Sequence, residues 1–575
     1  MRLLKYIFLT IISMATLVSC DDFLDTVTDS SIPTETALQD RDIFLGFFYK
    51  AYQDLPERVN FSYEAATDNA IVNKDSYNES KAARGGITTQ SNPLDDDIWE
   101  TNYKNINTIN WFLEKMVLDE TKAVPTPVRF DLNEDVNLKK FYLTLGEAYF
   151  LRAWYQMDLL EKYGGVAEDG VAYGFPITTS YLEYSDDLNL PRNTYAECVQ
   201  QISNDCDKAF EYLPLQYSES TGSLDVGLLT DAGRGSGIAA LALKARAYLY
   251  QASPAFNVSN SNELWNKAAT AAAEAIEAIG DDDLMSLSAY YSKNNLNNGT
   301  DFTNPDLFFR GPIVEDDNTL ERENFAPRMN GGQGKFNPAQ NLVDAFPMSD
   351  GYPKGTSPTV TFDEDAQFAG RDARLEKAVV HHGESFGGIT LSTLTGGLDA
   401  FGSDQNATRS GYYLQKLLDS SVSLEANNQV KTTRAVYLLG RPELYLNFAE
   451  AAVQATGDPD DAQFGYSART ILAKVRDRAL GQGNDQYLPT VTTKEAFIDV
   501  VRNERRVELC FEDFRFWDLR RWSAGVEDKS LIETPAYGIY SESPVETRSF
   551  ASPYMPIPYT EIIKTSGTLI NNKGW

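Results

Sequence analysis

The sequence predicts a mostly α-helical protein built from pairs of helices, with one long, loop-rich insert that contains short β-strands. Apolar residues recur at helical spacing over residues 36–280 and again over 440–525. Between these regions, residues 281–439 are rich in Gly, Asn, Asp and Pro and hold short β-like runs such as 307–309 and 378–380. A connection of this length is uncommon in a compact domain unless it carries function, so we expect the insert to be functional.

Composition and charge narrow the class of protein. The chain has 575 residues, of which 42% are hydrophobic and 23% are charged, as is typical of a globular protein. Its 51 basic and 83 acidic residues give a net charge of −32. An acidic surface repels phosphate backbones and anionic lipids, which argues against nucleic-acid binding and electrostatic docking to membranes. Two His and four Cys nearly exclude multi-His metal centres, zinc fingers and haem attachment, so we expect no cofactor.

The first twenty residues predict a bacterial lipoprotein signal. Arg2 and Lys5 supply positive charge, and residues 6–18 are mostly apolar but too few to span a membrane. The run ends in Leu-Val-Ser before Cys20, which resembles the lipobox that is cleaved ahead of an acylated cysteine. An ordinary secretory signal that happens to end near a cysteine is the alternative. We therefore expect residues 1–19 to be removed and Cys20 to carry a lipid that anchors the protein without crossing the membrane.

The helical regions divide into four predicted pairs. A helix over 138–163 contains Tyr-x2-Leu-Gly146-x2-Tyr, which resembles the W-x2-L-G-x2-Y opening of a tetratricopeptide repeat, and the small Gly146 allows close packing of its partner. That partner is predicted over 194–213, after a long insertion, so the repeat is degenerate. Four such tetratricopeptide-like pairs would form a right-handed helical scaffold. The other three are predicted at 36–55 with 97–118, 235–252 with 263–279, and 442–456 with 464–480.

Two cysteines of the second pair are interpreted as core residues. Cys198 and Cys206 lie on one predicted helix, about 12 Å apart along its axis, which is too far for a disulfide. They share a stripe with Ile202, Phe210 and Leu213, which is typical of a buried helix face. Their predicted role is that of small buried hydrophobic side chains.

No catalytic or nucleotide-binding motif is complete. Residues 330–336 lack the Ser or Thr that follows Lys in a phosphate-binding loop, and residues 233–238 lack the last Gly of the dinucleotide motif and are interpreted as a loop that opens the next helix. The acidic runs 95–97 and 281–283 are interpreted as solvated loop or helix-cap residues. One sequence does not establish a pair of acids at glycosidase spacing, and no segment matches an EF-hand, so calcium binding is unsupported.

The C-terminal tail predicts a helix stabilised by ion pairs. Over residues 502–522 the acids are spaced as regularly as the arginines, which argues against RNA binding despite the interleaved aromatics. Glu512 with Arg515, and Asp518 with Arg521, stand three residues apart and are expected to pair. We interpret the segment as a structural ion-pair network.

The same tail is similar to the signature E-R-R-x-E-L-x-F-E-x-x-R-x-x-D-L-R-R-W of the SusD/RagB family of Bacteroidetes outer-membrane lipoproteins. Other landmarks follow in the family's order: G-E-A-Y-F-L-R-A from Gly146, Y-G-G-V from Tyr163, P-R-N-T from Pro191 and Y-M-P-I-P from Tyr554. The usual ending Gln-Asn-Pro-Gly-Trp is replaced by Asn-Asn-Lys-Gly-Trp575, a small departure. The resemblance spans nearly the whole chain.

The resemblance implies a function. Family members have a mostly α fold of four tetratricopeptide-like pairs, lie as a lid over a TonB-dependent SusC-like transporter, and have no catalytic activity. It therefore implies that the protein captures an oligosaccharide at the cell surface and passes it to such a transporter. Asp21 and Asp22, directly after Cys20, resemble the surface-export signal of these lipoproteins and imply display on the outer face of the outer membrane. The alternatives are a peptide-binding lid of a RagB-like importer, a surface glycoside hydrolase and a purely scaffolding repeat protein.

The predicted ligand site uses polar and aromatic residues of the long loops. Neutral sugars need exposed aromatic platforms flanked by polar groups, and aromatics on helix stripes belong to the core. The candidates are Tyr77, Asn78, Arg84 and Trp99 from the loop before the second helix, and Tyr290, Tyr291, Asn324, Phe325 and Arg328 from the insert. Trp99 also fits a structural tryptophan at a helix start. We expect the two loops to converge on one face, opposite the helices that dock on the transporter barrel.

These interpretations divide the chain into five parts. They are a signal peptide (1–19), a lipidated tether (20–35), an N-terminal helical part (36–280), the loop-rich insert with the ligand face (281–439), and a C-terminal helical pair with the signature tail (440–575).

Overall fold

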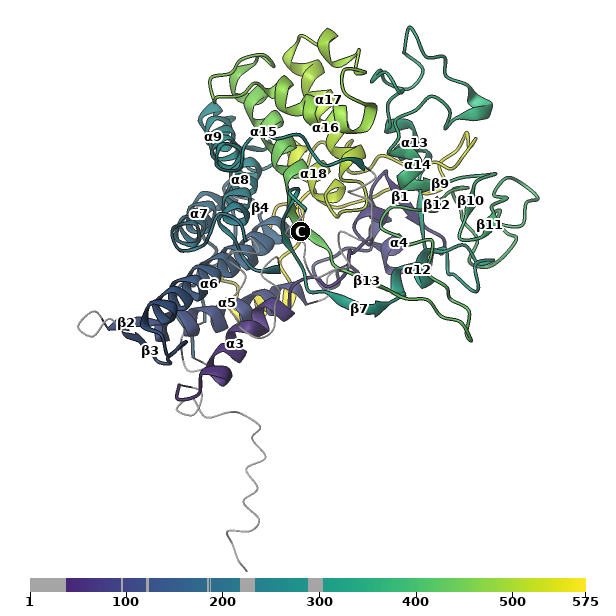
Figure 1. The fold of residues 1–575 in the computed structure, drawn as a ribbon. Coiled ribbons are helices and arrows are strands. Elements are labelled where there is room, and N and C mark those ends of the chain that lie inside the picture. Colours follow the sequence, from purple (N-terminus) through teal and green to yellow (C-terminus); the bar gives the residue numbers. More distant parts are fainter. Residues whose placement is uncertain are drawn as a thin grey trace, which may run out of the picture.

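An arc of helices and a body of loops and short strands make up the molecule (Figure 1). The computed structural model describes residues 38–94, 97–119, 124–183, 186, 188–217, 233–287 and 304–575. The predicted signal peptide, Cys20 and the tether lie outside the described residues, and so do Tyr290 and Tyr291. None of the described helices is long and apolar enough to cross a membrane.

Four helix pairs form the arc, which we call the scaffold, and the sequence predicts all four. They are α3 (Arg41–Gln53) with α5 (Ile98–Lys115), α6 (Glu134–Tyr163) with α7 (Tyr195–Tyr212), α8 (Gly237–Ala252) with α9 (Asn262–Ile279), and α15 (Arg441–Thr456) with α16 (Ala468–Leu480). Consecutive helices pack on one another from α5 to α9. α9 also packs directly on α15, although the insert separates the two helices in the sequence. One continuous apolar core therefore runs through the scaffold.

The second pair shows why its residues form closely packed helices. A Cβ atom at Gly146 of α6 would lie 2.8 Å from Cγ of Leu213 and 3.0 Å from Cβ of Tyr212, so only glycine permits this approach. At the start of α7, Thr194 Oγ1 accepts a hydrogen bond from the Glu197 N–H, and the Glu197 carboxylate accepts one from the Thr194 N–H. This capping box satisfies two backbone donors that the helix leaves free.

The two cysteines of α7 are buried, as predicted. Cys198 and Cys206 are free thiols, and both pack in the scaffold core with Ile202. The prediction that Phe210 shares this stripe is wrong, because its side chain is 43% exposed. The buried face of α7 continues instead through Ala209, one residue earlier.

The insert, residues 281–439, leaves and rejoins the scaffold at one place because its two ends pair. β6 (Leu307–Arg310) runs antiparallel to β14 (Tyr437–Gly440), and β7 (Val314–Asp317) runs antiparallel to β13 (Thr432–Arg434). This closure lets α9 and α15 remain neighbours. Farther out lie the pairs of β9 (Val379–Val380) with β12 (Tyr413–Leu414) and β10 (Ser385–Phe386) with β11 (Ile389–Thr390). The β-like runs predicted at 307–309 and 378–380 coincide with β6 and β9.

The loop between α3 and α5 packs against both the scaffold and the insert, because Tyr63, Ala83 and Ile87 belong to the scaffold core and Phe61 and Val72 to a second core. It contains η2 (Glu64–Ala66), β1 (Ala70–Val72) and α4 (Asn78–Ala83), and β1 pairs antiparallel with β8 (Phe336–Pro338). A second apolar core joins this loop to the insert and to the C-terminal tail. The shorter elements elsewhere are β2 (Val117–Asp119), β3 (Val124–Thr126), β4 (Gly165–Val166), β5 (Ala172–Tyr173), α12 (Thr319–Asn324), α13 (Gln340–Ala345), η5 (Glu364–Ala366), α14 (Leu375–Ala378) and η6 (Leu488–Thr490).

The C-terminal tail forms two helices, so the prediction of one helix over 502–522 is wrong. α17 (Lys494–Glu508) and α18 (Arg515–Trp522) are separated by a turn in which Phe511 and Asp513 adopt positive φ angles of 61° and 68°. Partners from elsewhere in the chain replace the expected local ion pair. Glu512 lies 2.6 Å from Lys416 of the insert, and Arg515 lies 3.0 Å from Asp68. The predicted pair of Asp518 with Arg521 is confirmed at 2.8 Å.

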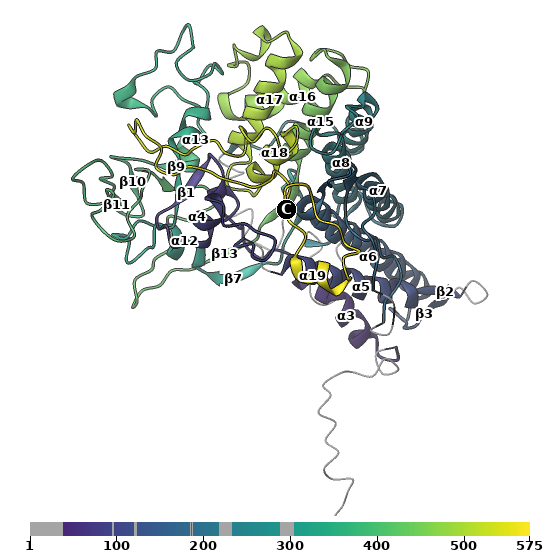
Figure 2. The same ribbon diagram turned by 180° about the vertical axis from the view of Figure 1, so that it is seen from behind.

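A buried cluster of charges holds the insert against the fourth helix pair. Arg374 of the insert lies 2.6 Å from Glu504 and 2.7 Å from Glu508, both on α17. On α16, Arg476 lies 2.9 Å from Glu504, and Arg478 pairs with Glu508. The expectation that the tail carries a structural ion-pair network is therefore confirmed, with partners that come from three segments. Figure 2 shows the reverse side, where the last helix, α19 (Tyr559–Lys564), lies beside α5.

Candidate ligand-binding site

The loop before α5 and the insert meet along one surface. The Asn73 amide donates hydrogen bonds to the Gln333 carbonyl oxygen at 2.7 Å and to the Asn406 carbonyl oxygen at 2.9 Å. A guanidinium nitrogen of Arg409 lies 2.8 Å from the Asp75 carboxylate. The two loops that the sequence predicts to converge therefore do so. We call residues 73–84, 328–335 and 398–409 together the loop face.

Tyr77 lies half-buried in the loop face. Its ring packs against the core that joins the loop to the insert. The ammonium nitrogens of Lys74 and Lys335 lie 5.7 and 5.3 Å from the ring centre, within the range of cation–π attraction. Lys335 is also held 2.9 Å from the Glu79 carboxylate. The ring is thereby fixed in place, and the neighbouring Asn78, the first residue of α4, is exposed.

Arg84 directly follows α4 as its C-cap residue and forms the polar rim of the loop face. Its guanidinium donates to the carbonyl oxygens of Ser80 at 3.1 Å and Asp75 at 3.0 Å, and it lies 3.5 Å from the Asp75 carboxylate. The same exposed carboxylate also accepts from Arg409. One acid therefore stands between two guanidinium groups, so the rim offers donors and acceptors without a large local charge.

Arg328 is held at the other end of the loop face by Asp399. Two hydrogen bonds join them, at 2.8 and 2.9 Å, and Arg328 also donates to the Thr390 carbonyl oxygen at 2.7 Å. The hydrogen bonds that Arg328 donates to the Asp399 carboxylate raise the pKa of Arg328, because they favour the charged guanidinium. Asp399 is fully buried, whereas about a third of the Arg328 side chain, 34%, remains exposed for a ligand.

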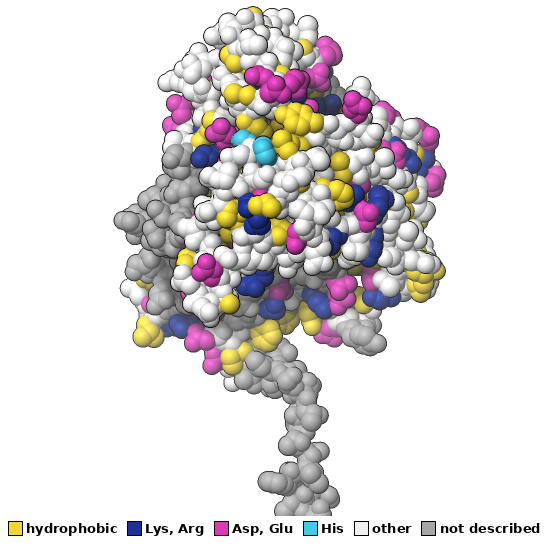
Figure 3. Space-filling view, turned by 90° about the vertical axis from the view of Figure 1, so that its right-hand side faces the viewer, with side chains coloured by type: hydrophobic (Ala, Val, Ile, Leu, Met, Phe, Trp, Pro, Cys, Tyr) yellow, Lys and Arg dark blue, Asp and Glu magenta, His cyan; other side chains and the backbone are white. Residues whose placement is uncertain are grey.

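Two residues beside Asp399 were not predicted from the sequence. Leu398 is 65% exposed and Phe401 is 74% exposed, more than any other aromatic side chain of the described residues. Phe401 stands in a Gly-containing loop of the insert, so the search for aromatics in long loops could have found it. Figure 3 looks onto the insert, where basic and acidic side chains are scattered singly or in small groups among uncharged ones. This is a surface suited to an uncharged ligand.

The expectation that Asn324 and Phe325 contact ligand is wrong, because both are buried. Phe325 is 2% exposed and lies edge-on to Phe386, with ring centres 5.7 Å apart, in a small apolar cluster that includes Met329. The Asn324 amide donates to the Leu320 carbonyl oxygen at 2.8 Å. Both side chains hold α12 in the insert and leave no surface for a sugar.

Trp99 has a structural environment. It is 7% exposed, and its ring packs against Tyr103 and Tyr163 with centres 5.1 Å away in each case. This agrees with the alternative interpretation of a structural tryptophan at a helix start. Its edge lines a hollow of about 330 Å³ between α5 and α19, together with Asn107 and Lys564, which does not share residues with the loop face.

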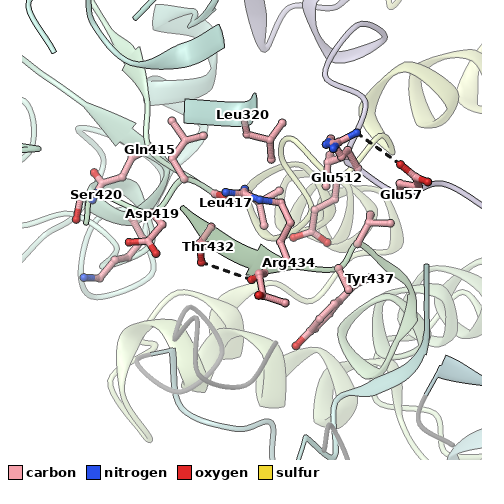
Figure 4. A pocket seen from close by; sticks show the side chains of 17 residues that line it. Glu57, Leu320, Gln415, Leu417, Asp419, Ser420, Thr432, Arg434, Tyr437 and Glu512 are labelled. Carbon is pink, nitrogen blue, oxygen red and sulfur yellow. Dashed lines mark hydrogen bonds and ion pairs between the residues drawn. The ribbon is translucent and has the colours of Figure 1, made fainter. Parts of the chain in front are cut away.

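A further groove, of about 300 Å³, lies where the insert meets residues 57–59 of the loop after α3 and Glu512 of the C-terminal tail (Figure 4). Its lining mixes aliphatic side chains such as Leu320, Leu417 and Val436 with polar and charged ones such as Gln415 and Arg434. The guanidinium of Arg434, a residue labelled in Figure 4, is already paired with the carboxylates of Asp317 at 3.1 Å and Glu321 at 2.7 Å. With Tyr437 as the aromatic residue of this lining, the groove has fewer stacking surfaces for sugars than the loop face.

The loop face presents groups for binding. Its arginines are paired with carboxylates, and its aromatics are fixed or exposed side chains. Among the residues that the structure describes, no group of three or more His, Cys, Asp or Glu side chains is placed to hold a metal ion. The arrangement can stack on apolar sugar faces and exchange hydrogen bonds with hydroxyl groups.

Comparison with known protein families gives two matches that together leave out only residues 1–21 and 250–289. The model described as the SusD family matches residues 290–575. The model described as starch-binding and associating with the outer membrane matches residues 22–249.

Individual proteins also resemble this chain over most of its length. A SusD-like protein from Formosa agariphila is 23% identical over 538 residues, covering 90% of this chain and 91% of the relative. A SusD-like protein from Bacteroides fragilis superposes with a TM-score of 0.71 at 22% identity, covering 94% of this chain and 98% of the other. A second B. fragilis structure, described as a SusD-like carbohydrate-binding protein, gives a TM-score of 0.68 at 20% identity and covers 93% and 99%. At these identities the structural likeness establishes the fold.

Proposed function

Since the chain belongs to the SusD/RagB family, we propose that it captures oligosaccharide at the cell surface for import. The family is described as associated with the outer membrane, and described relatives bind carbohydrate. The observation that carries the proposal for this chain is the loop face, where exposed and half-buried aromatics stand among paired charges. Phe401 and Tyr77 would stack on the apolar faces of sugar rings, and Arg84 and Arg328 would donate to hydroxyl groups.

Ion pairs within the loop face favour a neutral ligand. Arg328 is neutralised by Asp399, and Arg84 and Arg409 share Asp75. A guanidinium already paired with an acid retains free N–H donors but loses most of its attraction for an anion. The pairs also hold the side chains in place before binding, which lowers the entropy cost of capturing a flexible glycan. Asn78, Tyr290 and Tyr291 remain proposed contacts.

Binding is tested by affinity gel electrophoresis and calorimetry against a panel of neutral polysaccharides. The double variant Tyr77→Ala with Phe401→Ala should lose retention while its thermal melt stays close to that of the wild type. Phe210→Ala, which removes a 43% exposed ring on the scaffold, is the matched control and should retain full binding. Retention by the double variant would place the site elsewhere.

The same panel separates glycan from the alternatives. If the protein binds peptides and no polysaccharide, its ligand is a peptide, as in a RagB-like importer. Its proposed role in capturing nutrient would stay the same. Release of reducing sugar by the purified protein would indicate a glycoside hydrolase. The paired charges of the loop face favour glycan over peptide, whose termini and side chains carry net charges.

Anchoring is proposed to occur through acylated Cys20. Stable attachment needs more than one acyl chain, which triacylation would supply. Cys20→Ala should leave the precursor uncleaved and shift the protein out of the membrane fraction, whereas Cys510→Ala, at a buried thiol, should still be labelled by palmitate. Unchanged palmitate labelling of Cys20→Ala would contradict the anchor.

The proposed partner is a SusC-like TonB-dependent transporter in the outer membrane. The outer surfaces of the scaffold helices would dock on its barrel, and the loop face would hand the ligand inward. Purification of the native lipoprotein from membranes in mild detergent should bring down such a transporter. Recovery of the lipoprotein only as a free monomer under those conditions would count against the partnership.

A further inference from the structure

Arg520 is a buried arginine that has no acidic partner among the described residues. It lies on α18, is 4% exposed, and its guanidinium carbon stands 3.3 Å from the centre of the Phe516 ring and 4.6 Å from that of Phe550. One nitrogen, Nη1, donates to the Phe516 carbonyl oxygen at 3.3 Å. The next residue, Arg521, differs in pairing with both Glu450 and Asp518.

The unpaired atoms of Arg520 are Nε and Nη2, the two nitrogens with which other arginines of this protein hold a carboxylate. Arg152 uses Nε and Nη2 to hold Asp205, with both distances 2.7 Å. Arg246 uses the same two nitrogens to hold Glu443, at 2.7 and 2.6 Å. In Arg520 these two nitrogens are buried and have no acceptor among the described residues. Of these three arginines, Arg520 is therefore the one whose Nε and Nη2 have no carboxylate partner among the described residues.

A small cavity adjoins Arg520. It is lined by Tyr250, Trp517, Tyr554 and Met555, all at most 5% exposed, together with Glu161. The indole N–H of Trp517 is a second buried donor with no acceptor among the described residues. The cavity has a volume of about 10 Å³, measured as the space open to the centre of a water-sized sphere. That is room for one water-sized particle and excludes acetate, phosphate or a sugar.

We propose that Arg520 and Trp517 form a buried binding site for one halide-sized monovalent anion. A guanidinium remains charged in proteins, and a buried charge without a partner is strongly destabilising. Burial alone lowers the pKa of Arg520 well below its usual range, and no carboxylate opposes this effect. A water molecule would accept the hydrogen bonds without compensating the charge, whereas a halide ion does both. Glu161 lines the same cavity, but Lys162 Nζ lies 3.8 Å from its carboxylate, which offsets its charge.

The position of this site links it to the stability of the fold. Its lining residues come from α6 and Gly164 just after it, from α8 and the loop that follows it, from α18, and from the segment 553–555. An anion there would neutralise the junction between the scaffold and the C-terminal tail. The inference does not depend on the proposed function, because the cavity shares no residue with the loop face.

The direct test is a crystal of the wild-type mature protein grown in sodium bromide, with anomalous data collected at the bromine absorption edge. We expect an anomalous peak within hydrogen-bond distance of Arg520 Nε or Nη2 and Trp517 Nε1. A non-anomalous water peak at that position, with bromide at surface sites only, would overturn the proposal.

The second test is thermal unfolding in sodium chloride, sodium bromide and sodium gluconate at equal ionic strength. Ligand binding to the folded state raises Tm with the concentration of the ligand, so Tm should be higher in the halides and should saturate. Trp517→Phe should require more halide for the same shift, and Arg520→Met should abolish it. Arg84→Met, which removes an exposed guanidinium, should keep it. Equal Tm values of the wild type in halide and gluconate would overturn the site, whether or not Arg520→Met folds.

Discussion

Arg328 and Asp399, 71 residues apart in the sequence, form a two-point ion pair in which Nε and Nη2 lie 2.8 and 2.9 Å from the two carboxylate oxygens. Asp399 is fully buried, and it also accepts a hydrogen bond from the Ser392 N–H at 2.8 Å. The pair joins the segment after α12 to the loop that carries Phe401. The position of Phe401 on the loop face therefore depends on a contact between distant parts of the insert.

Arg328→Met should weaken both the fold and the proposed ligand binding. It leaves a buried carboxylate without its charged partner, which typically costs about 1–3 kcal/mol of unfolding free energy. Loss of the donors and of the loop position should reduce polysaccharide affinity about tenfold or more, equivalent to about 1.4 kcal/mol. Denaturant unfolding and calorimetry measure the two effects. Arg322→Met, at an exposed residue of α12, is the control, and equal stability of the two variants would argue against the role of the pair.

Phe401→Ala should reduce ligand affinity and leave stability unchanged. The ring is 74% exposed, so its loss should change the unfolding free energy by less than about 0.5 kcal/mol. By analogy with base stacking, the lost ring should cost about 1–3 kcal/mol of binding free energy. Calorimetric titration with the polysaccharide that the wild type binds measures this loss. Unaltered affinity would remove Phe401 from the site.

Phe325→Ala should have the opposite profile. Its side chain is 2% exposed and packs in a closed apolar cluster, so truncation leaves a cavity and should cost about 3–5 kcal/mol of unfolding free energy. Phe325→Leu should recover most of this stability. A denaturation midpoint near that of the wild type for the alanine variant would mean that the ring is not buried.

Glu450→Gln should remove an acid-sensitive part of the stability. Burial by itself would raise the pKa of Glu450, but Arg521, together with Arg505 and Arg502, lowers it from 4.5 to about 2. A folded-state pKa below the unfolded value means that ionisation favours folding. This contribution, about 3 kcal/mol, is complete above about pH 4.5 and is lost as the pH falls toward 2.

The difference in unfolding free energy between the wild type and Glu450→Gln should therefore shrink as the pH is lowered from 7 to 2. Glu495→Gln, at an exposed position of α17, is the control and should follow the wild type throughout. A difference that stays constant over this range would contradict the shifted pKa of Glu450.

The described thiols should not react in the native protein. Burial raises the pKa of Cys198 and of Cys510 to about 12, and it also raises the pKa of Cys206. Because the thiolate is the reactive form, a disulfide reagent at pH 8 should modify none of the three before unfolding. In denaturant the mature protein should show three reactive thiols, and a fourth would mean that Cys20 is not acylated.

The helix pairs could be predicted because their signals are local. Apolar spacing and a capping residue such as Thr194 act within one helix. The glycine at 146 acts between two helices that follow one another in the chain. The helices α3, α5, α7, α8, α9, α15 and α16 lie within a few residues of their predicted ranges for this reason, and α6 begins four residues before its predicted start. The short strands β6 and β9 were also visible as apolar runs in a polar insert.

The tail and the ligand site could not be predicted to the same depth, because distant partners decide them. Glu512 and Arg515 have ideal spacing for a local pair, yet Glu512 pairs with Lys416 and Arg515 pairs with Asp68. The helix is broken at the turn that contains Asp513, between the two residues. Phe325 and Phe401 both occur in polar loop sequences. One faces a cluster formed by residues far along the chain, and the other faces solvent.

By itself the sequence determined the fold class, the helix pairs, the position of the insert and the resemblance to the SusD/RagB family. Periodicity and motif spacing record these features along the chain. Only the tertiary structure decided which loop aromatics are exposed, which acid each arginine binds, and that Arg520 has none among the described residues. Burial and ion pairing depend on the packing of segments that lie tens to hundreds of residues apart, and no local pattern encodes that packing.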